Sequence, residues 1–153
     1  MKKYELTNET KVYFGKTLYR IKALISFGNV IAGELGGFIE REENLSHEGT
    51  AWVGDNSRVY GNARVYDDAE VYEDAGVCGD AKVYSNAEVY GKAWVYGNAE
   101  VCGNAEVYDN ALVSGSAKVY DNALVYDDAL VSGNAKVCGN AVVCDSADNK
   151  EES

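Results

Sequence analysis

The chain has 153 residues with no proline, 16 glycines and a formal net charge of −11 at pH 7. This length fits one domain, and the negative charge disfavours non-specific binding to nucleic acid or to an anionic membrane surface. No apolar run approaches the roughly 20 residues that cross a bilayer, and the first residues are too polar for a secretory signal, so we expect a cytoplasmic protein.

The first 50 residues lack the short repeat that fills the rest of the chain. Residues 11–14 and 17–24 predict the strands of a β-hairpin, joined by a turn at Gly15 and Lys16. A glycine-punctuated stretch follows, from Gly28 to Gly37. A solenoid needs an atypical end unit that closes its core, so we expect residues 1–50 to be a cap. A small partner-binding module is the alternative.

Residues 53–148 repeat a six-residue unit with no insertion or deletion. Along a strand such as Ala81–Tyr84, alternation places alanine and valine inside and lysine and tyrosine outside. Three strands per coil give about five triangular coils around a core of valine and alanine. This core is too narrow for a ligand, so function is expected outside it. Catalytic sites on such a scaffold usually need an interruption, and the repeat has none.

These patterns divide the chain into a cap, residues 1–50, a repeat domain, residues 51–148, and a polar tail, residues 149–153. The repeat resembles the hexapeptide-repeat proteins, over about two thirds of the chain. That resemblance implies a single-stranded, left-handed parallel β-helix, all-β in class, and assembly into trimers.

The segment GELGGFIEREENLSHEGTAWV, which precedes the repeat, has a narrower resemblance. It is similar to the cap of uncharacterised hexapeptide-repeat proteins of bacteria and phages. The matching residues are Gly36, Gly37, Phe38, Ile39, Glu40, Asn44, Leu45, Ser46, Gly49, Trp52 and Val53. This resemblance implies a phage or prophage source and brings no known activity with it.

Residues 18 apart lie on the same wall of the predicted coil. The first, or tyrosine, wall combines aromatic and acidic columns. They are Tyr72, Tyr90, Tyr108 and Tyr126, with Glu70, Glu88 and Glu106. Stacked aromatic rings stabilise exposed strands, which is the simplest interpretation of the tyrosines. Because tyrosine is enriched at interfaces, a partner-binding strip is the alternative.

The second, or apolar, wall presents Trp94, Leu112 and Leu130 in one column beside Tyr96. Contiguous exposed apolar residues usually mark an interface, so we expect self-association through this wall. The hexapeptide-repeat resemblance favours a trimer over a dimer.

The third, or lysine, wall carries basic residues that Glu100 interrupts. Its candidate site residues are Lys82, Lys118 and Lys136, with Tyr84 and Tyr120 beside them. A solvated charged face is the simplest interpretation. Alternatively, the lysines hold a phosphate while the tyrosines stack a base. One corner of the coil is acidic and is expected to attract a cation only loosely. Its residues are Asp55, Glu73, Asp109, Asp127 and Asp145.

Little in the chain predicts catalysis. The acyltransferases among hexapeptide-repeat proteins generally use a histidine base, but the single histidine here, His47, precedes the repeat and is interpreted as a cap residue. The three histidines of a carbonic anhydrase zinc site are lacking, and no cofactor or metal is predicted. The four cysteines are expected to be free thiols, because Cys102 and Cys138, which share a column, lie two coils apart.

We therefore predict a non-catalytic binding or assembly protein, phage-encoded and acting in the host cytoplasm. Its partner would be a host protein, which an acidic rod could engage by imitating nucleic acid, or a small phosphorylated signal molecule. Either would give an anti-defence role. The alternative is a hexapeptide-repeat acyltransferase that uses CoA thioesters.

Overall fold

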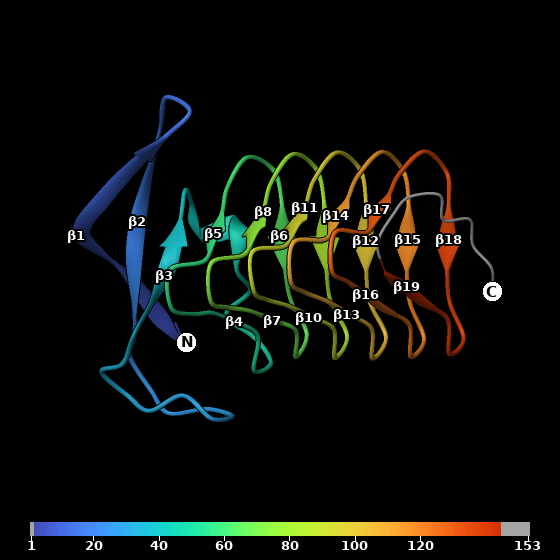
Figure 1. Ribbon diagram of the computed structural model, residues 1–153. Helices are drawn as coiled ribbons and strands as arrows, with labels where there is room; N and C mark the ends of the chain where they lie inside the picture. Colours follow the sequence, from blue (N-terminus) through green and yellow to red (C-terminus); the bar gives the residue numbers. More distant parts are fainter. Residues whose placement is uncertain (1, 145–153) are drawn as a thin grey trace.

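The protein is a parallel β-solenoid with a β-hairpin at its N-terminal end, as a computed structural model shows for residues 2–144 (Figure 1). Short strands stack along one axis in three sheets, and each coil contributes one strand to each sheet. The all-β parallel β-helix predicted from the repeat is confirmed. Its left hand stays a prediction. Among the described residues, no helix is long and apolar enough to cross a membrane.

Each solenoid strand belongs to one wall of the coil. The N-terminal elements are β1 (Tyr4–Tyr13), β2 (Lys16–Ala23), β3 (Leu35–Ile39) and the 3₁₀ turn η1 (Glu42–Asn44). The tyrosine wall consists of β4 (Trp52–Val53), β7 (Glu70–Val71), β10 (Glu88–Val89), β13 (Glu106–Val107), β16 (Leu124–Tyr126) and β19 (Val142–Cys144). The apolar wall consists of β5 (Arg58–Val59), β8 (Gly76–Val77), β11 (Trp94–Val95), β14 (Leu112–Val113) and β17 (Leu130–Val131). The lysine wall consists of β6 (Arg64–Val65), β9 (Lys82–Val83), β12 (Glu100–Val101), β15 (Lys118–Val119) and β18 (Lys136–Val137).

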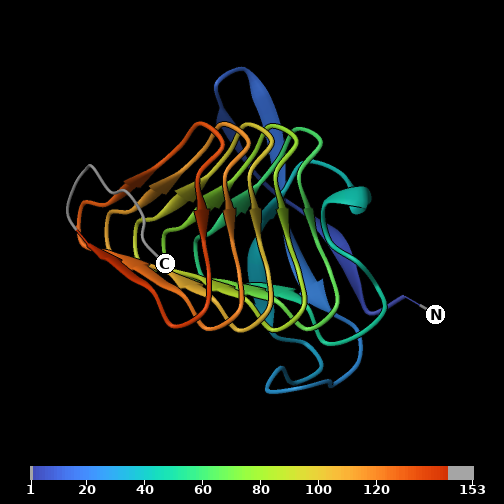
Figure 2. The same cartoon turned by 90° about the vertical axis from the view of Figure 1, so that its right-hand side faces the viewer.

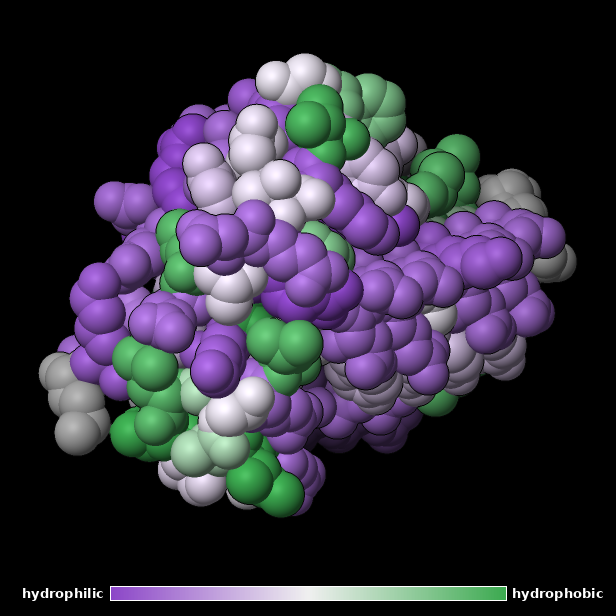
Figure 3. Space-filling view, turned by 90° about the vertical axis from the view of Figure 1, so that its left-hand side faces the viewer, coloured by the Kyte–Doolittle hydropathy of each residue, from purple (hydrophilic) through white to green (hydrophobic). Residues whose placement is uncertain are grey.

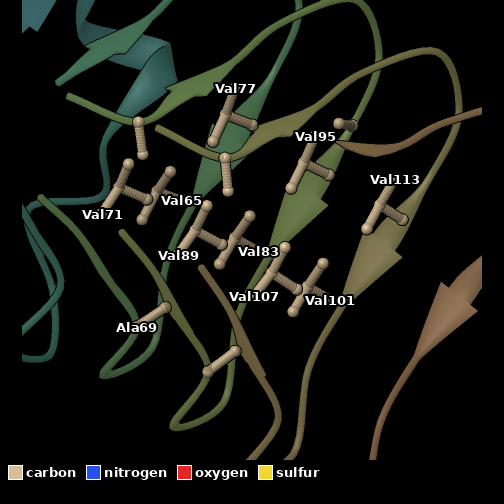
Figure 4. Close-up of a cluster of buried hydrophobic side chains, with 14 of the residues drawn as sticks. Val65, Ala69, Val71, Val77, Val83, Val89, Val95, Val101, Val107 and Val113 are labelled. Carbon is tan, nitrogen blue, oxygen red and sulfur yellow. The ribbon is translucent and has the colours of Figure 1, made fainter. Parts of the chain in front are cut away.

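The core is a stack of valines and alanines, as the alternation predicts. Val89 pairs with Val71 on one side and with Val107 on the other, and all three side chains are fully buried. Figure 4 shows valines of all three walls pointing toward one another. Each buried valine stabilises the fold by about 1.5–3 kcal/mol relative to an exposed one. The coils are therefore filled, and ligand chemistry is confined to their outside.

The corners of the coil use acidic side chains for a structural purpose. The first corner residue has positive φ, as at Asp67 (φ 59°) and Glu73 (φ 59°), a conformation that Gly supplies at other corners. The Asp67 carboxylate accepts the N–H of Ser85 at 3.2 Å, and the Glu73 carboxylate accepts that of Gly91 at 2.9 Å. Part of the acidic corner is thus occupied by the next coil's backbone. Asp145, which was assigned to the same column, lies outside the described residues, as does the predicted tail.

The solenoid has about six turns, one more than the repeat by itself predicts. The parallel ladder begins before the repeat, because Ile39 pairs with Val59 and Leu45 with Val65, a spacing of 20 residues. The spacing becomes 18 at the pairing of Trp52 with Glu70. The first coil is therefore two residues longer than the others, and η1 lies in its corner.

Asn44 holds this longer corner together from a fully buried position. Its Oδ1 accepts the N–H groups of Glu40 (3.0 Å) and Arg41 (2.9 Å). Its Nδ2 donates to the carbonyls of Ala63 (2.8 Å) and Gly61 (3.2 Å). In later coils the ladder's own backbone binds such carbonyls, as when Lys82 N–H donates to Ala99 O. The Asn44 amide thus replaces ladder bonds that the turn disrupts.

The N-terminal hairpin extends the sheet of the apolar wall, in the order β1-β2-β3-β5 (Figure 2). Its first strand starts at Tyr4, earlier than the predicted residue 11, because residues 4–10 are a polar edge strand without a strong apolar alternation. The predicted turn at Gly15 and Lys16 is wrong by one residue. Phe14 (φ 50°) and Gly15 (φ 78°) form it, since a two-residue hairpin turn of this type needs two positive φ angles.

The Asn44 network gives a first prediction. Asn44→Ala removes four hydrogen bonds at once and leaves buried backbone groups unpaired, so we expect a loss of about 3 kcal/mol in the free energy of unfolding. Hydrogen exchange of residues 36–66, together with urea unfolding, measures it. Asn104→Ala is the control, because that exposed side chain has one long hydrogen bond, to Asn122. An Asn44→Ala protein as stable as the control would contradict the prediction.

Candidate functional site

The tyrosine wall is a continuous stack of parallel rings. The ring centres of Tyr72, Tyr90, Tyr108 and Tyr126 follow one another at 4.9, 4.9 and 5.2 Å, with interplanar angles of at most 8°. This spacing is that of neighbouring strands, about 4.8 Å, so the backbone ladder sets the distance between rings. The stacked tyrosines predicted from the sequence are therefore present.

Each coil of this wall is also tied to the next through its polar atoms. The hydroxyl of Tyr72 donates to Glu88 Oε1 at 2.8 Å, and that of Tyr90 donates to Glu106 Oε1 at 2.7 Å. Burial, followed by the bond to the carboxylate, raises the pKa of both tyrosines. Burial, followed by repulsion from Glu88, raises the pKa of the Glu70 carboxyl. The strip proposed for partner binding thus already satisfies many of its polar groups within the chain.

On the apolar wall, Trp94 packs against its own chain. Its ring lies against Gly76, where an added Cβ would be 2.3 Å from a ring atom, and meets Tyr60 edge-on at 6.3 Å between ring centres. The Arg58 guanidinium lies 5.6 Å from the Trp94 ring centre and 4.4 Å from that of Tyr13, a hairpin residue. The hairpin therefore continues this aromatic cluster, so that less of Trp94 is open to a second subunit than the sequence implies.

The rest of the apolar column stays accessible. Leu130 is 45% exposed and Tyr96 is 36% exposed, whereas Leu112 is half-buried. Seen from its N-terminal end, the molecule shows further apolar groups at the top and bottom of a largely hydrophilic surface (Figure 3). Self-association through this column stays a prediction.

The lysine wall presents Lys82, Lys118 and Lys136 as exposed side chains, as predicted. Glu100, which interrupts them, accepts the hydroxyl of Tyr84 at 2.9 Å. Hydrogen bonding to Cys102 and burial raise the pKa of Tyr84. All four cysteines are free thiols, as expected.

Two adjoining hollows lie at the N-terminal end of the lysine wall, beside the long corner of the first coil. One has a volume of about 370 Å³ and the other about 260 Å³. They share Glu43, Arg64 and Lys82. The larger is also lined by Ser46, His47 and Tyr66. Its size is within the range of about 300–1,000 Å³ that is typical of small-molecule sites.

Two neighbouring cations dominate the charge of the hollows. Arg64 and Lys82 pair directly in the ladder, and neither forms an ion pair within residues 2–144. The facing carboxylate of Glu42 is bound by Lys2 at 2.9 Å and by His47 at 3.0 Å. The hollow thus combines free cationic groups with an aromatic ring and is suited to a small anion.

His47 lines the larger hollow, but both of its ring nitrogens are occupied. Nδ1 accepts the backbone N–H of Lys3 at 3.0 Å, so Nε2 carries the proton and donates it to Glu42 Oε1 at 3.0 Å. The ring also stacks on Tyr4 at 4.1 Å. No lone pair is left to take a proton from a substrate, and this geometry supports the interpretation of His47 as a cap residue.

Comparison with known proteins supports the repeat fold. Residues 57–73 and 117–133 match the family model described as the YdcK β-solenoid repeat. A stretch of 67 residues is 34% identical to the protein named uncharacterized acetyltransferase YdcK of Escherichia coli (strain K12). It covers 39% of this chain and 21% of that protein, so the chain spans about a fifth of this relative's length. The similarity supports a β-helix built from repeats, and the phage source implied by the cap segment stays a prediction.

Sequence reasoning assigned Arg64 and Tyr66 to the lysine wall but did not choose them as site residues, and it did not place Ser46 beside them. The signal was present in the cap, where Asn44-Leu45-Ser46 takes the place of Arg64-Val65-Tyr66 one coil earlier. The spacing of 20 residues hides this match from a search at 18. The hollow therefore lies at the one coil that departs from the regular length.

The tyrosine wall predicts a pH dependence of stability. Because folding raises the pKa of Tyr72 and Tyr90 above the value of about 10 in an unfolded chain, the folded state keeps protons that the unfolded state loses. Their stabilising contribution is therefore complete below pH 10 and is lost as the pH rises further. We expect the thermal midpoint to fall above pH 10, and to fall less in a Tyr72→Phe/Tyr90→Phe variant. Glu106→Gln, which keeps the ring stack, should give an intermediate slope. Equal slopes in all three proteins would show that other groups control the effect.

Proposed function

We propose that the protein is a non-catalytic binding protein whose ligand is a small phosphorylated molecule, held at the N-terminal end of the lysine wall. The observation that carries this proposal is the pair Arg64 and Lys82. These adjacent cations have no carboxylate partner among the described residues, and both line both hollows. Guanidinium and ammonium groups in this arrangement offer charge-assisted hydrogen bonds to phosphate oxygens.

The geometry also supports binding without chemistry. The coils are filled by valine and alanine, and the ring nitrogens of His47 are engaged by Lys3 and Glu42. Burial raises the pKa of the Cys78 thiol, which disfavours the reactive thiolate. A nucleophile paired with a base is the usual requirement for group transfer, and the surroundings of these residues do not supply it.

The cap segment supports a phage or prophage source for this binding protein. In a host cytoplasm, sequestration of a phosphorylated signal molecule would blunt a defence response. The acidic tyrosine wall offers a second form of the same role, in which Glu70, Glu88 and Glu106, aligned in one column, imitate nucleic acid toward a host protein. We favour the small ligand, because the hollow and the unpaired cations lie on the lysine wall.

Calorimetric titration with inorganic phosphate and a panel of sugar phosphates and nucleotides tests the proposal. We expect at least one phosphorylated compound to bind, and Arg64→Gln/Lys82→Gln to weaken its binding at least about tenfold, since each lost charge-assisted bond contributes more than 1 kcal/mol.

The matched control for that titration is Lys118→Gln/Lys136→Gln, which removes the same charge from the far end of the same wall. Binding should survive in this variant. Equal weakening in both double variants would indicate general charge attraction, and the absence of any binding phosphorylated compound would overturn the proposal.

Acyl transfer is a second candidate, and the name of the similar Escherichia coli protein is the observation that favours it. It requires a CoA thioester to bind and His47 to act as base, which would cost about 10²–10⁴-fold in rate when removed. Because His47 has no free lone pair, we expect no acetyl-CoA binding at millimolar concentration and no CoA release above background by chromatography. Turnover that His47→Ala abolishes would establish the enzyme instead.

A further inference from the structure

The short tyrosine stack of the lysine wall ends at the larger hollow. The rings of Tyr66 and Tyr84 lie parallel, with centres 4.9 Å apart and an interplanar angle of 4°. One coil earlier, the N–H of Ser46 donates to Val65 O at 3.0 Å, as the N–H of Tyr66 donates to Val83 O at 3.1 Å. Ser46 thus holds the ladder position that tyrosine holds in the next two coils.

This exchange of tyrosine for serine shapes the hollow. One face of the Tyr66 ring is covered by Tyr84, and Tyr66 lines the hollow together with Ser46 and His47 of the preceding coil. A flat group that enters the hollow above Tyr66 would continue the stack at the spacing that the ladder already imposes. Sequence-tolerant stacking on an aromatic side chain is how many proteins hold a nucleobase.

The charged groups around this ring define the rest of the ligand. Arg64 and Lys82 stand in the column next to that of Tyr66 and Tyr84, so they flank the same hollow. The exposed Glu43 lies on its rim, where its carboxylate would repel a second phosphate and accept a hydrogen bond from a hydroxyl or amino group. Glu42 is already bound by Lys2 and His47.

We propose that this hollow binds a nucleoside monophosphate or a similar molecule, one that joins a planar aromatic ring to a single phosphate. The ring stacks on Tyr66, the phosphate binds Arg64 and Lys82, and Glu43 accepts from a hydroxyl or amino group between them. This inference rests on the proposed function, because it names the class of ligand that the same cations hold.

Calorimetry with three probes separates the contributions of ring and phosphate. The probes are AMP, which has both, adenosine, which has the ring, and ribose 5-phosphate, which has the phosphate. We expect AMP to bind at least tenfold more tightly than either of the other two. Ribose 5-phosphate binding as tightly as AMP would overturn the stacking proposal and leave the proposed function standing. Failure of all three, together with every other phosphorylated compound, would overturn both.

A designed tyrosine provides the sharper test. Ser46→Tyr should place a third ring on the Tyr66 stack and fill the hollow, so AMP binding should fall at least tenfold while the thermal midpoint is kept. Cys102→Tyr is the matched control, because it adds a ring beyond Tyr84 on the same wall, away from the hollow, and should leave AMP affinity unchanged. If Ser46→Tyr does not fold, Tyr66→Leu, which removes the stacking face, replaces it with the same expectation. Unchanged AMP affinity in the folded variant would contradict the proposal.

Discussion

The parallel ladder between coils is the interaction on which the rest of the structure depends. Every strand of the repeat pairs with the strand 18 residues further on, so like residues are stacked at the strand spacing of about 4.8 Å. The valines fill the core because of this register, and Tyr90 stacks between Tyr72 and Tyr108 because of it. The same register would place charges of one sign side by side. The protein limits that cost on the tyrosine wall by giving Glu88 and Glu106 a tyrosine hydroxyl.

The long first coil is where the ladder is relaxed and where a cavity becomes available. Two extra residues require a turn that cannot continue the backbone bonds, and the buried amide of Asn44 supplies the donors and the acceptor that the turn needs. The same coil exchanges tyrosine for serine at residue 46. A regular solenoid has flat walls, so a ligand of small size can be enclosed only where such an irregular unit stands against a regular one.

The cap also limits which surfaces are open. The hairpin extends the sheet of the apolar wall, and Tyr13 joins Arg58 and Trp94 in one cluster on its outside. In the long corner, Lys3 and Glu42 engage His47 from both sides. Both residues looked available for function in the sequence, and both have structural contacts that a repeat pattern does not reveal. The resemblance to an acetyltransferase by name covers repeats, which many functions share, and so it carries the fold better than the chemistry.

The sequence by itself determined the solenoid, the inward valines and alanines, the membership of each wall and the exposed lysines, because a strict period leaves one register that buries the apolar residues. It also identified the stacked tyrosines. Only the tertiary structure decided that Ser46 stands in the place of a tyrosine, that Arg64 and Lys82 line a hollow and that Trp94 packs under Arg58. These facts depend on a first coil of 20 residues and on contacts with a hairpin distant in sequence. Short-range alternation and an 18-residue period carry no information about either.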